Sequence, residues 1–497
     1  MGRSSLPRVL ALLLAWGLIG DAAAQPRPND PAQEQPPLGQ ERIERLLNQA
    51  ERLSGVLQSR QQRLSLADAL AMGLARNPDL ASAYEAIEGR AWTLIAARRS
   101  WYPSLQVVGS GSALRSNEPV LMSTTLTLRD SSSGASQSIL SNASGPGVVL
   151  NWSFFDSRRQ PSINVALDNL KAQRFLFDIA ARNLALNVQL AYTAVQAQSE
   201  LLQRYDWLLD LTIRQTEIAN RLVREGRLSR SALDQLTTEK RLQLTRLLDR
   251  YQQLFVASNS LTALVAGTPG QYVLSADPLT QQAPWPMGLD ETLNQALNLR
   301  EEIAQKLTLA ARDRWAATRA INGYLPVFGL VGVSSLSAYQ ETVNQQPGSS
   351  RDTWAHTVGL NFRWTVFDGG ILAAEATALK AQAAEQVNNA DSQKLLVSKE
   401  VMNAYAGFVT ARLAAENTGK DFALARRSLG EISGAFPRKP DVTTLIQSFN
   451  LYTSAADKDV GAISQFNSAV FSLYRSSARW PAGVPDQIKL RQAQLRR

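Results

Sequence analysis

The 497-residue sequence contains no cysteine and only one histidine, His356. Without cysteine the chain can form neither disulfides nor thiolate metal sites, and thiol catalysis is excluded. A single histidine also excludes a multi-histidine metal site, and the sequence shows no recognisable catalytic constellation. The segments "GSG" at 109–111 and "GTPG" at 267–270 lack the setting and the following lysine of a phosphate-binding loop. The sequence therefore predicts a protein that is not an enzyme and that holds neither cofactor nor metal ion.

Long apolar runs are almost absent. The one continuous stretch, "VLALLLAWGLIG", follows Arg3 and Arg8 and precedes the small residues "AAAQ". This pattern is typical of a secretory signal peptide, here residues 1–24, with cleavage after Ala24. The stretch is too short to cross a bilayer, and no later segment offers the roughly 18 apolar residues of a transmembrane helix. We therefore expect an exported chain without a helical membrane anchor.

The formal net charge of +9 is not concentrated in one block. Lysine and arginine alternate with aspartate and glutamate along the predicted helices, which is typical of solvated helix surfaces. Only the C-terminal segment 479–497 is locally basic, and we expect it to be a disordered tail. The charge pattern therefore predicts no nucleic-acid partner.

The chain contains an internal duplication, because similar segments recur in the same order in its two halves. The matched segments are 64–80 with 287–303, 101–105 with 324–328, 151–156 with 363–368, and 191–195 with 404–408. Few residues are identical, but the collinear order across about 200 residues makes chance a poor explanation. Each half is predicted to contain a helix of about 36 residues (66–101 in the first), a strand, a polar loop, a second strand, a very long helix and a shorter helix.

This repeated order defines the predicted domains. They are the signal peptide 1–24; a Pro/Gln-rich leader with a short helix, 25–63; repeat 1, 64–286, with strands 103–115 and 146–156 and helices 157–225 and 231–266; repeat 2, 287–478, with strands 326–339 and 354–368 and helices 369–434 and 441–478; and the tail 479–497. The serine-rich segment 116–145 is predicted to be a solvent-facing loop.

The two longest predicted helices carry a coiled-coil-like stripe. Positions at alternating three- and four-residue steps from Ile163 are mostly apolar, and several are alanines that allow neighbouring helices to approach closely. At 1.5 Å per residue, helix 157–225 is on the order of 100 Å long. Helices 66–101 and 231–266 together match that length, so we expect them to stack end to end along it. A soluble helical bundle alone would leave the strands without a role.

The strands that end at Asp156 and Asp368 alternate between apolar and polar residues. The aromatic residues on their apolar side, predicted to face lipid, are Trp152, Phe154, Trp354, Phe362 and Trp364. Such alternation is typical of membrane β-barrel strands, although one face of a soluble β-sandwich shows it too. Four strands cannot close a barrel, and an open edge is not tolerated in lipid. We therefore expect three copies of the chain to supply a barrel of twelve strands.

At this point the sequence resembles the TolC-like outer-membrane efflux proteins, or outer-membrane factors. The resemblance covers residues 65–478 and depends on the duplicated order and on the segments "WYPSL", "GYLPVF", "FFD" and "VFDGG". It implies a mostly α fold with membrane β-structure, in which a trimer forms a 12-stranded β-barrel that continues into a periplasmic α-helical barrel. Asp156 and Asp368 would mark the junctions between the two barrels, each in position to cap the next helix.

The resemblance also implies a function. The chain would be the outer-membrane exit duct of a tripartite efflux or type I secretion system in a Gram-negative-type bacterium, extending into the periplasm. Its partners would be two further copies, outer-membrane lipid, a periplasmic adaptor (membrane fusion protein), and an inner-membrane pump or ABC transporter. The alternatives are a structural coiled-coil surface protein and a periplasmic adaptor, but an adaptor has no need of two membrane-like strands in each repeat.

The candidate gate residues lie at the two predicted hairpin turns, near residues 226 and 437. In the family, aspartates just past the second turn line the periplasmic entrance and favour cations. Asp441 matches the first such position, and Thr444 occupies the second, so a double acidic ring is not expected. Asp441 is also suited to a purely structural role as the cap of the following helix. The remaining candidates, which make both turns basic or let them bend, are Gly226, Arg227, Arg438 and Lys439.

Overall fold

The computed structural model describes residues 48–49, 51–53, 55–56, 59–108, 123–130, 136–144, 146–343, 346–481 and 484, with no description of the side chains of 123–130, 136–144, 337–343, 346–351 and 353. The chain divides into two compact units, residues 1–49 and 50–497, and the second contains all the elements discussed below. The predicted signal peptide, most of the leader, residues 109–115 of the first predicted strand, and the tail beyond Pro481 apart from Val484 lie outside the described residues.

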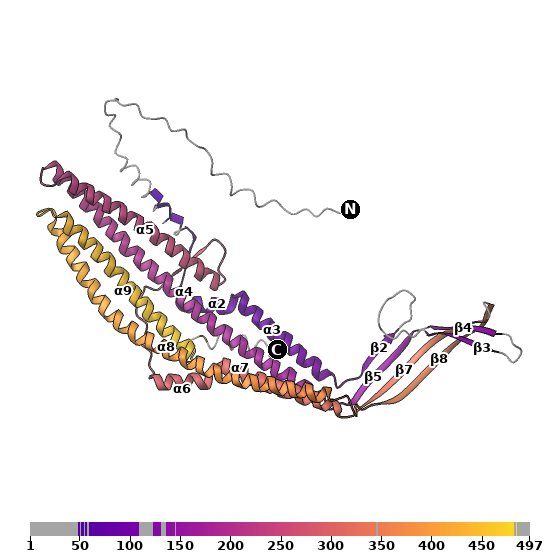
Figure 1. Ribbon diagram of the computed structural model, residues 1–497. Helices are drawn as coiled ribbons and strands as arrows, with labels where there is room; N and C mark the ends of the chain where they lie inside the picture. Colours follow the sequence, from indigo (N-terminus) through magenta and orange to yellow (C-terminus); the bar gives the residue numbers. More distant parts are fainter. Residues whose placement is uncertain are drawn as a thin grey trace, which may run out of the picture. The chain divides into compact units, whose positions relative to one another are not determined.

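Two long helical hairpins dominate the second unit (Figure 1). The helices are α2 (Leu66–Arg76), α3 (Pro78–Arg99), α4 (Arg159–Arg224), α5 (Arg230–Leu264), α6 (Leu289–Leu299), α7 (Glu301–Ile321), α8 (Ile371–Ala435) and α9 (Val442–Ser476). α4 and α8 contain 66 and 65 residues, so each is on the order of 100 Å long. α4 packs against α3, α5, α7 and α9, which makes it the central helix of the unit.

The predicted unbroken helix 66–101 is wrong, because the structure divides it into α2 and α3 at Asn77. Pro78 has no backbone N–H and disfavours helical geometry at the residue before it. The Asn77 side chain then accepts hydrogen bonds from the backbone N–H groups of Asp79 and Leu80, at 3.0 and 3.2 Å. α6 and α7 are divided in the same way at Arg300, the corresponding position of the second half.

The strands form two sheets. β1 (Gln61–Leu64) pairs in parallel with β6 (Tyr272–Ser275). The larger sheet is antiparallel and consists of β2 (Ser104–Val108), β3 (Ser123–Asp130), β4 (Ser136–Ser144), β5 (Gly147–Phe155), β7 (Val327–Val343) and β8 (Gln346–Arg363). Near the helices its order is β2-β5-β7-β8, and farther along β7 the strand β4 takes the place of β5. Among the described residues, β2, β3 and β8 each have one edge without a partner strand.

The first half differs from the prediction in its connecting segment. The sequence predicted a solvent-facing loop over 116–145, but residues 123–130 and 136–144 form β3 and β4. β4 pairs with the C-terminal end of β7, which lies in the second half of the chain. The sequence of the serine-rich segment gives no sign of this distant partner strand. β8 also begins earlier and ends earlier than predicted, and Trp364 lies just outside it.

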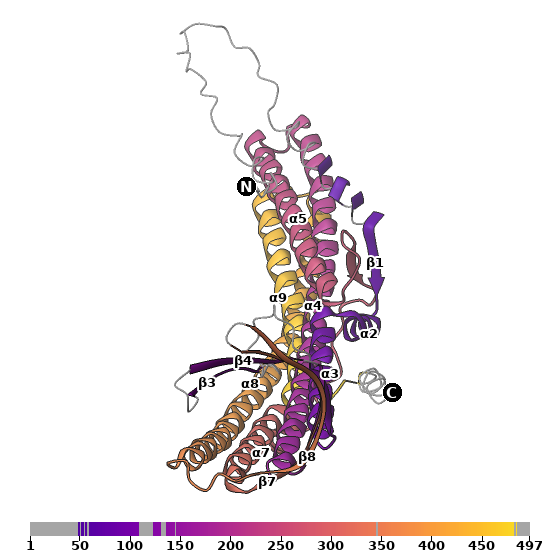
Figure 2. The same cartoon turned by 90° about the vertical axis from the view of Figure 1, so that its right-hand side faces the viewer.

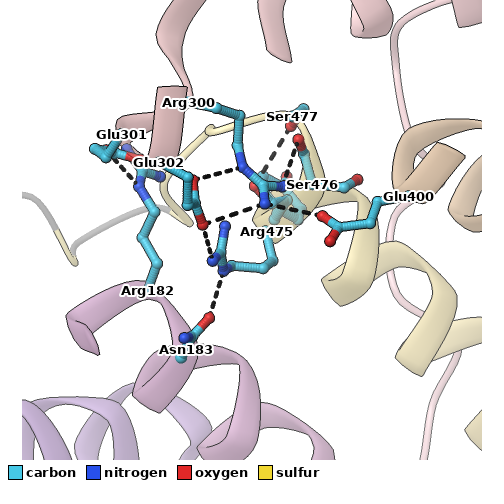
Figure 3. A network of polar contacts seen from close by, with 10 residues as sticks. Arg182, Asn183, Arg300, Glu301, Glu302, Glu400, Arg475, Ser476 and Ser477 are labelled. Carbon is cyan, nitrogen blue, oxygen red and sulfur yellow. Dashed lines mark hydrogen bonds and ion pairs between the residues drawn. The ribbon is translucent and has the colours of Figure 1, made fainter. Parts of the chain in front are cut away.

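A buried ion-pair network joins the break between α6 and α7 to α8 and α9 (Figure 3). The Arg300 side chain is only 3% exposed; its Nε lies 2.9 Å from Glu302 Oε2, and its Nη2 lies 2.8 Å from Glu400 Oε2. Arg300 Nη1 donates to the carbonyl of Ser476 at 3.2 Å, and Arg475 Nη2 lies 2.5 Å from Glu302 Oε1. Burial would raise the pKa of Glu302, but Arg475 and Arg300 together hold it below its ordinary value.

The same network reaches α4 in the first half (Figure 3). Arg182 Nε lies 2.8 Å from Glu301 Oε1, and Arg475 Nε donates to Asn183 Oδ1 at 2.7 Å. Burial, with a contribution from the nearby Glu301 charge, raises the pKa of Asp178 to about 6. The two halves are therefore joined at this level by paired charges as well as by apolar packing.

Candidate functional site

One face of the larger sheet is apolar and exposed. The register places Trp152, Leu330 and Leu360 side by side on three neighbouring strands. Leu360 is 80% exposed and Val358 is 77% exposed. The five aromatic residues predicted to face lipid are also exposed: Trp152, Phe154, Trp354, Phe362 and Trp364. A contiguous apolar surface of this kind marks a contact with a membrane or with another protein.

Two of these tryptophans are held by equivalent hydrogen bonds in the two halves. Trp152 Nε1 donates to the carbonyl of Trp101 at 3.0 Å, and Trp364 Nε1 donates to the carbonyl of Tyr324 at 2.8 Å. Each indole therefore satisfies its polar N–H near the helices while its ring stays exposed. This combination suits a side chain at a boundary between apolar and aqueous surroundings.

Asp368 lies between β8 and α8 and caps the helix. Its carboxylate accepts the backbone N–H groups of Gly370 and Leu372, both at 2.9 Å, and the hydroxyl of Tyr324 at 2.7 Å. Gly369 and Gly370 follow Asp368 and turn the chain into α8. Their φ values of +71° and +86° favour glycine. The bond from Leu372, together with the Tyr324 hydroxyl, lowers the pKa of Asp368, so the cap is ionised at neutral pH.

Asp156 lies between β5 and α4, but its carboxylate has different hydrogen-bond partners from that of Asp368. It accepts the Arg158 backbone N–H at 3.0 Å and binds the Arg158 guanidinium through both oxygens, at 3.0 Å each. Burial opposes ionisation, yet the bonds and charge of Arg158 leave the pKa of Asp156 below its ordinary value. Arg158, the residue preceding α4, gives the helix no side-chain cap. Two adjacent arginines at a helix start oppose the helix dipole, and this was the available sequence signal of an unusual site.

The two hairpin turns are in direct contact. Gly226 turns the chain after α4 with a φ of +72°. Arg227 Nη2 then donates to the carbonyls of Pro437 and Arg438 in the other turn, at 3.2 and 3.3 Å. A shared apolar cluster lies behind these bonds, and its members at the turns include Leu222, Leu236, Phe436 and Leu445. The sequence selected Arg227 for its charge but contained no signal of its acceptors.

Asp441 and Thr444 lie together at the start of α9. Asp441 Oδ1 accepts the Thr444 backbone N–H at 3.1 Å, and Oδ2 accepts its hydroxyl at 2.7 Å. These bonds, with a smaller contribution from the Lys439 charge, lower the pKa of Asp441. Asp441 therefore caps α9 as an ionised, exposed carboxylate. Arg438 and Lys439 are exposed beside it.

The described residues contain no group of three or more histidine, aspartate and glutamate side chains that could hold a metal ion. Within the same residues, no helix contains a stretch both long and apolar enough to cross a bilayer. The features that stand out are thus surfaces: the apolar sheet face, the two strand-to-helix junctions and the joined turns.

No protein-family model matches the chain, and a comparison with curated proteins finds no match. Solved structures do match over most of their length. The outer-membrane channel OprN aligns over 85% of this chain and 93% of its own at 16% identity, with a TM-score of 0.67. The CmeC outer membrane channel of Campylobacter jejuni aligns over 86% and 89% at 15% identity, with a TM-score of 0.69. The outer membrane protein VceC of Vibrio cholerae aligns over 83% and 96% at 14% identity, with a TM-score of 0.65. At these identities the likeness establishes the fold.

Proposed function

We propose, from the TolC-like outer-membrane-factor fold that the chain has, that it is the outer-membrane exit duct of an efflux or secretion system. It conducts substrates passively, and a partner pump supplies the energy. By name, OprN and CmeC are outer-membrane channels and VceC is an outer membrane protein, which supports the same location for this chain. The observation that carries the proposal is the sheet, which has an exposed apolar face and, near the helices, two outer strands, β2 and β8, whose outer edges lack partner strands among the described residues.

Barrel closure follows from those edges. The part of the sheet nearest the helices has four strands in the order β2-β5-β7-β8. In lipid every backbone N–H and carbonyl needs a partner, so neither outer edge can stay open. Pairing β8 of one copy with β2 of the next satisfies both edges, and three copies give twelve strands, a number within the range of known barrels. We therefore propose a homotrimer in which the apolar face contacts outer-membrane lipid.

The helical hairpins extend this duct into the periplasm. We propose that the joined turns form the closed entrance and the docking site for a periplasmic adaptor and an inner-membrane pump. Arg227, Arg438 and Lys439 are exposed at this end, which supports salt-dependent docking onto acidic partner groups. Three copies of Asp441 would form one acidic ring, which favours cations at the entrance.

Two measurements test the duct. In planar bilayers the purified protein is expected to give discrete single-channel conductance steps, and an acidic ring predicts selectivity for potassium over chloride. Mass measurement of the detergent-extracted protein is expected to give three copies. A stable monomer would contradict barrel closure, and a trimer that leaves the bilayer silent even after Arg227→Ala loosens the turns would contradict a conduit.

A further inference from the structure

A cavity of about 780 Å³ lies where the sheet meets the ends of α3, α4, α7 and α8. Its lining includes Ser104, Asn151 and Ser153 from the sheet and Arg158, Arg159 and Arg319 from the helix ends. Its volume is within the range of small-molecule binding pockets. Neither the duct function nor the turns make use of it.

Arg159 is the unusual residue of this cavity. It is only 6% exposed. It donates through Nη2 to the Ser153 carbonyl and lies 4.4 Å from the centre of the Trp101 ring. Its Nη1 is buried and has no hydrogen-bond partner among the described residues. A buried charged donor without an acceptor is costly, so this guanidinium lacks one of the groups that would satisfy it.

A second arginine favours a negative charge at the same place. Arg319, at the end of α7, is exposed, and its side chain makes no hydrogen bond or ion pair with the residues that the structure describes. Of the acidic residues in the lining, Asp156 is occupied by Arg158. Glu375 alone remains to oppose Arg159 and Arg319.

We propose that this cavity is a binding site for an oxyanion, such as a phosphate group, held by the side chains of Arg159 and Arg319. The oxyanion supplies the acceptor that Arg159 Nη1 lacks. Ser104, Asn151 and Ser153 lie on the face of the sheet opposite to Leu360 and Trp152, so the ligand arrives from water and not from the lipid side. Given the proposed duct, that side is the lumen, and the trimer carries three such sites around the transport path.

Phosphorus-31 NMR of inorganic phosphate with the detergent-purified protein tests the site directly. The wild-type protein is expected to broaden the phosphate signal in a saturable way. Arg319→Gln, at an exposed position, is expected to fold normally and to weaken binding about tenfold, and Arg159→Gln is expected to weaken it further. Arg314→Gln removes an exposed arginine of the same helix that does not line the cavity, and it is expected to bind like the wild type.

The possible results separate the sources of the anion. If a soluble short-chain phosphatidylglycerol displaces bound phosphate, the oxyanion site is supported and also accepts a lipid headgroup. If that lipid binds and free phosphate does not, the claim that the ligand arrives from water is wrong. Absence of phosphate binding, or equal loss in Arg314→Gln and Arg319→Gln, would overturn the site itself. These outcomes do not depend on conductance, so failure of the oxyanion site and failure of the duct are distinguishable.

Discussion

The two halves of the chain place different residues at corresponding positions, and the consequences are visible at two levels. At the helix breaks, Asn77 caps α3 in the first half, while Arg300 occupies the matching position and enters a buried ion-pair network. At the junctions, Asp368 caps α8, while Asp156 binds Arg158 and leaves α4 uncapped. At each level one half uses a side-chain cap and the other a charge pair, and the two halves exchange these roles between the helix breaks and the junctions.

The residues that follow each aspartate decide whether its carboxylate caps the helix or pairs with an arginine. Gly369 and Gly370 follow Asp368 and allow the chain to turn back, so the carboxylate reaches the first helical N–H groups. Ser157, Arg158 and Arg159 follow Asp156, and a guanidinium two residues away takes the carboxylate instead. A shared Phe-Asp motif therefore fixes a position in the fold but not the interaction made there.

The largest change in stability is expected at the helix breaks, at Asn77 and Arg300. Replacing Arg300 with methionine leaves Glu302 without one buried partner and the Ser476 carbonyl without its donor. We expect the free energy of unfolding, measured in urea by loss of helical circular dichroism, to fall by about 3 kcal/mol. The matched change Asn77→Ala removes the cap of α3 and one hydrogen bond to the Leu264 carbonyl, and it is expected to cost about 2 kcal/mol. Equal losses at both positions would remove the proposed distinction between the breaks.

The junctions are expected to differ by a smaller amount. Asp368→Ala removes the acceptor of two backbone N–H groups and is expected to lower the free energy of unfolding by more than Asp156→Ala does. Asp156→Ala removes a partly exposed pair with Arg158 and is expected to cost less than about 1 kcal/mol. The same urea titration checks both, and a larger loss for Asp156→Ala would reverse the comparison.

A pH titration sharpens the comparison further, because the Arg300 network has a titrating neighbour. Asp178 has a pKa of about 6 in the folded chain, whereas an unfolded aspartate has one near 4. Between these values the folded state binds more protons, so stability falls as pH rises from about 4 to about 6. Asp178→Asn is expected to remove this fall, on the order of 1 kcal/mol. An unchanged pH profile in that variant would exclude Asp178 as its source.

The smallest expected effect concerns the turns, where the halves meet. Arg227→Ala removes two exposed hydrogen bonds to the second turn and is expected to cost roughly 0.5 kcal/mol of stability. If the duct closes there, the variant is also expected to open more often in single-channel recordings. Arg224→Ala, an exposed arginine on the last turn of α4, is the matched control and is expected to leave the open time unchanged.

Sequence pattern was sufficient for the mostly helical architecture with a small sheet, because long apolar stripes and alternating strands are local signals. It was not sufficient for β3 and β4, whose pairing depends on β7 about 200 residues away. The prediction of one helix over 66–101 also overlooked Pro78. Asp441 illustrates the same limit at the site: its cap on Thr444 follows from spacing, whereas the contact of Arg227 with Pro437 depends on how two hairpins pack.

After Pro161, α4 contains neither proline nor glycine as far as Arg224, where the first turn begins. Such a helix has no internal kink site at which a twist could be absorbed. We therefore expect a twist applied at the turns to be transmitted along α4 to Arg159, which lines the cavity beside the sheet. The proposed oxyanion pocket and the proposed periplasmic entrance lie at opposite ends of this one helix.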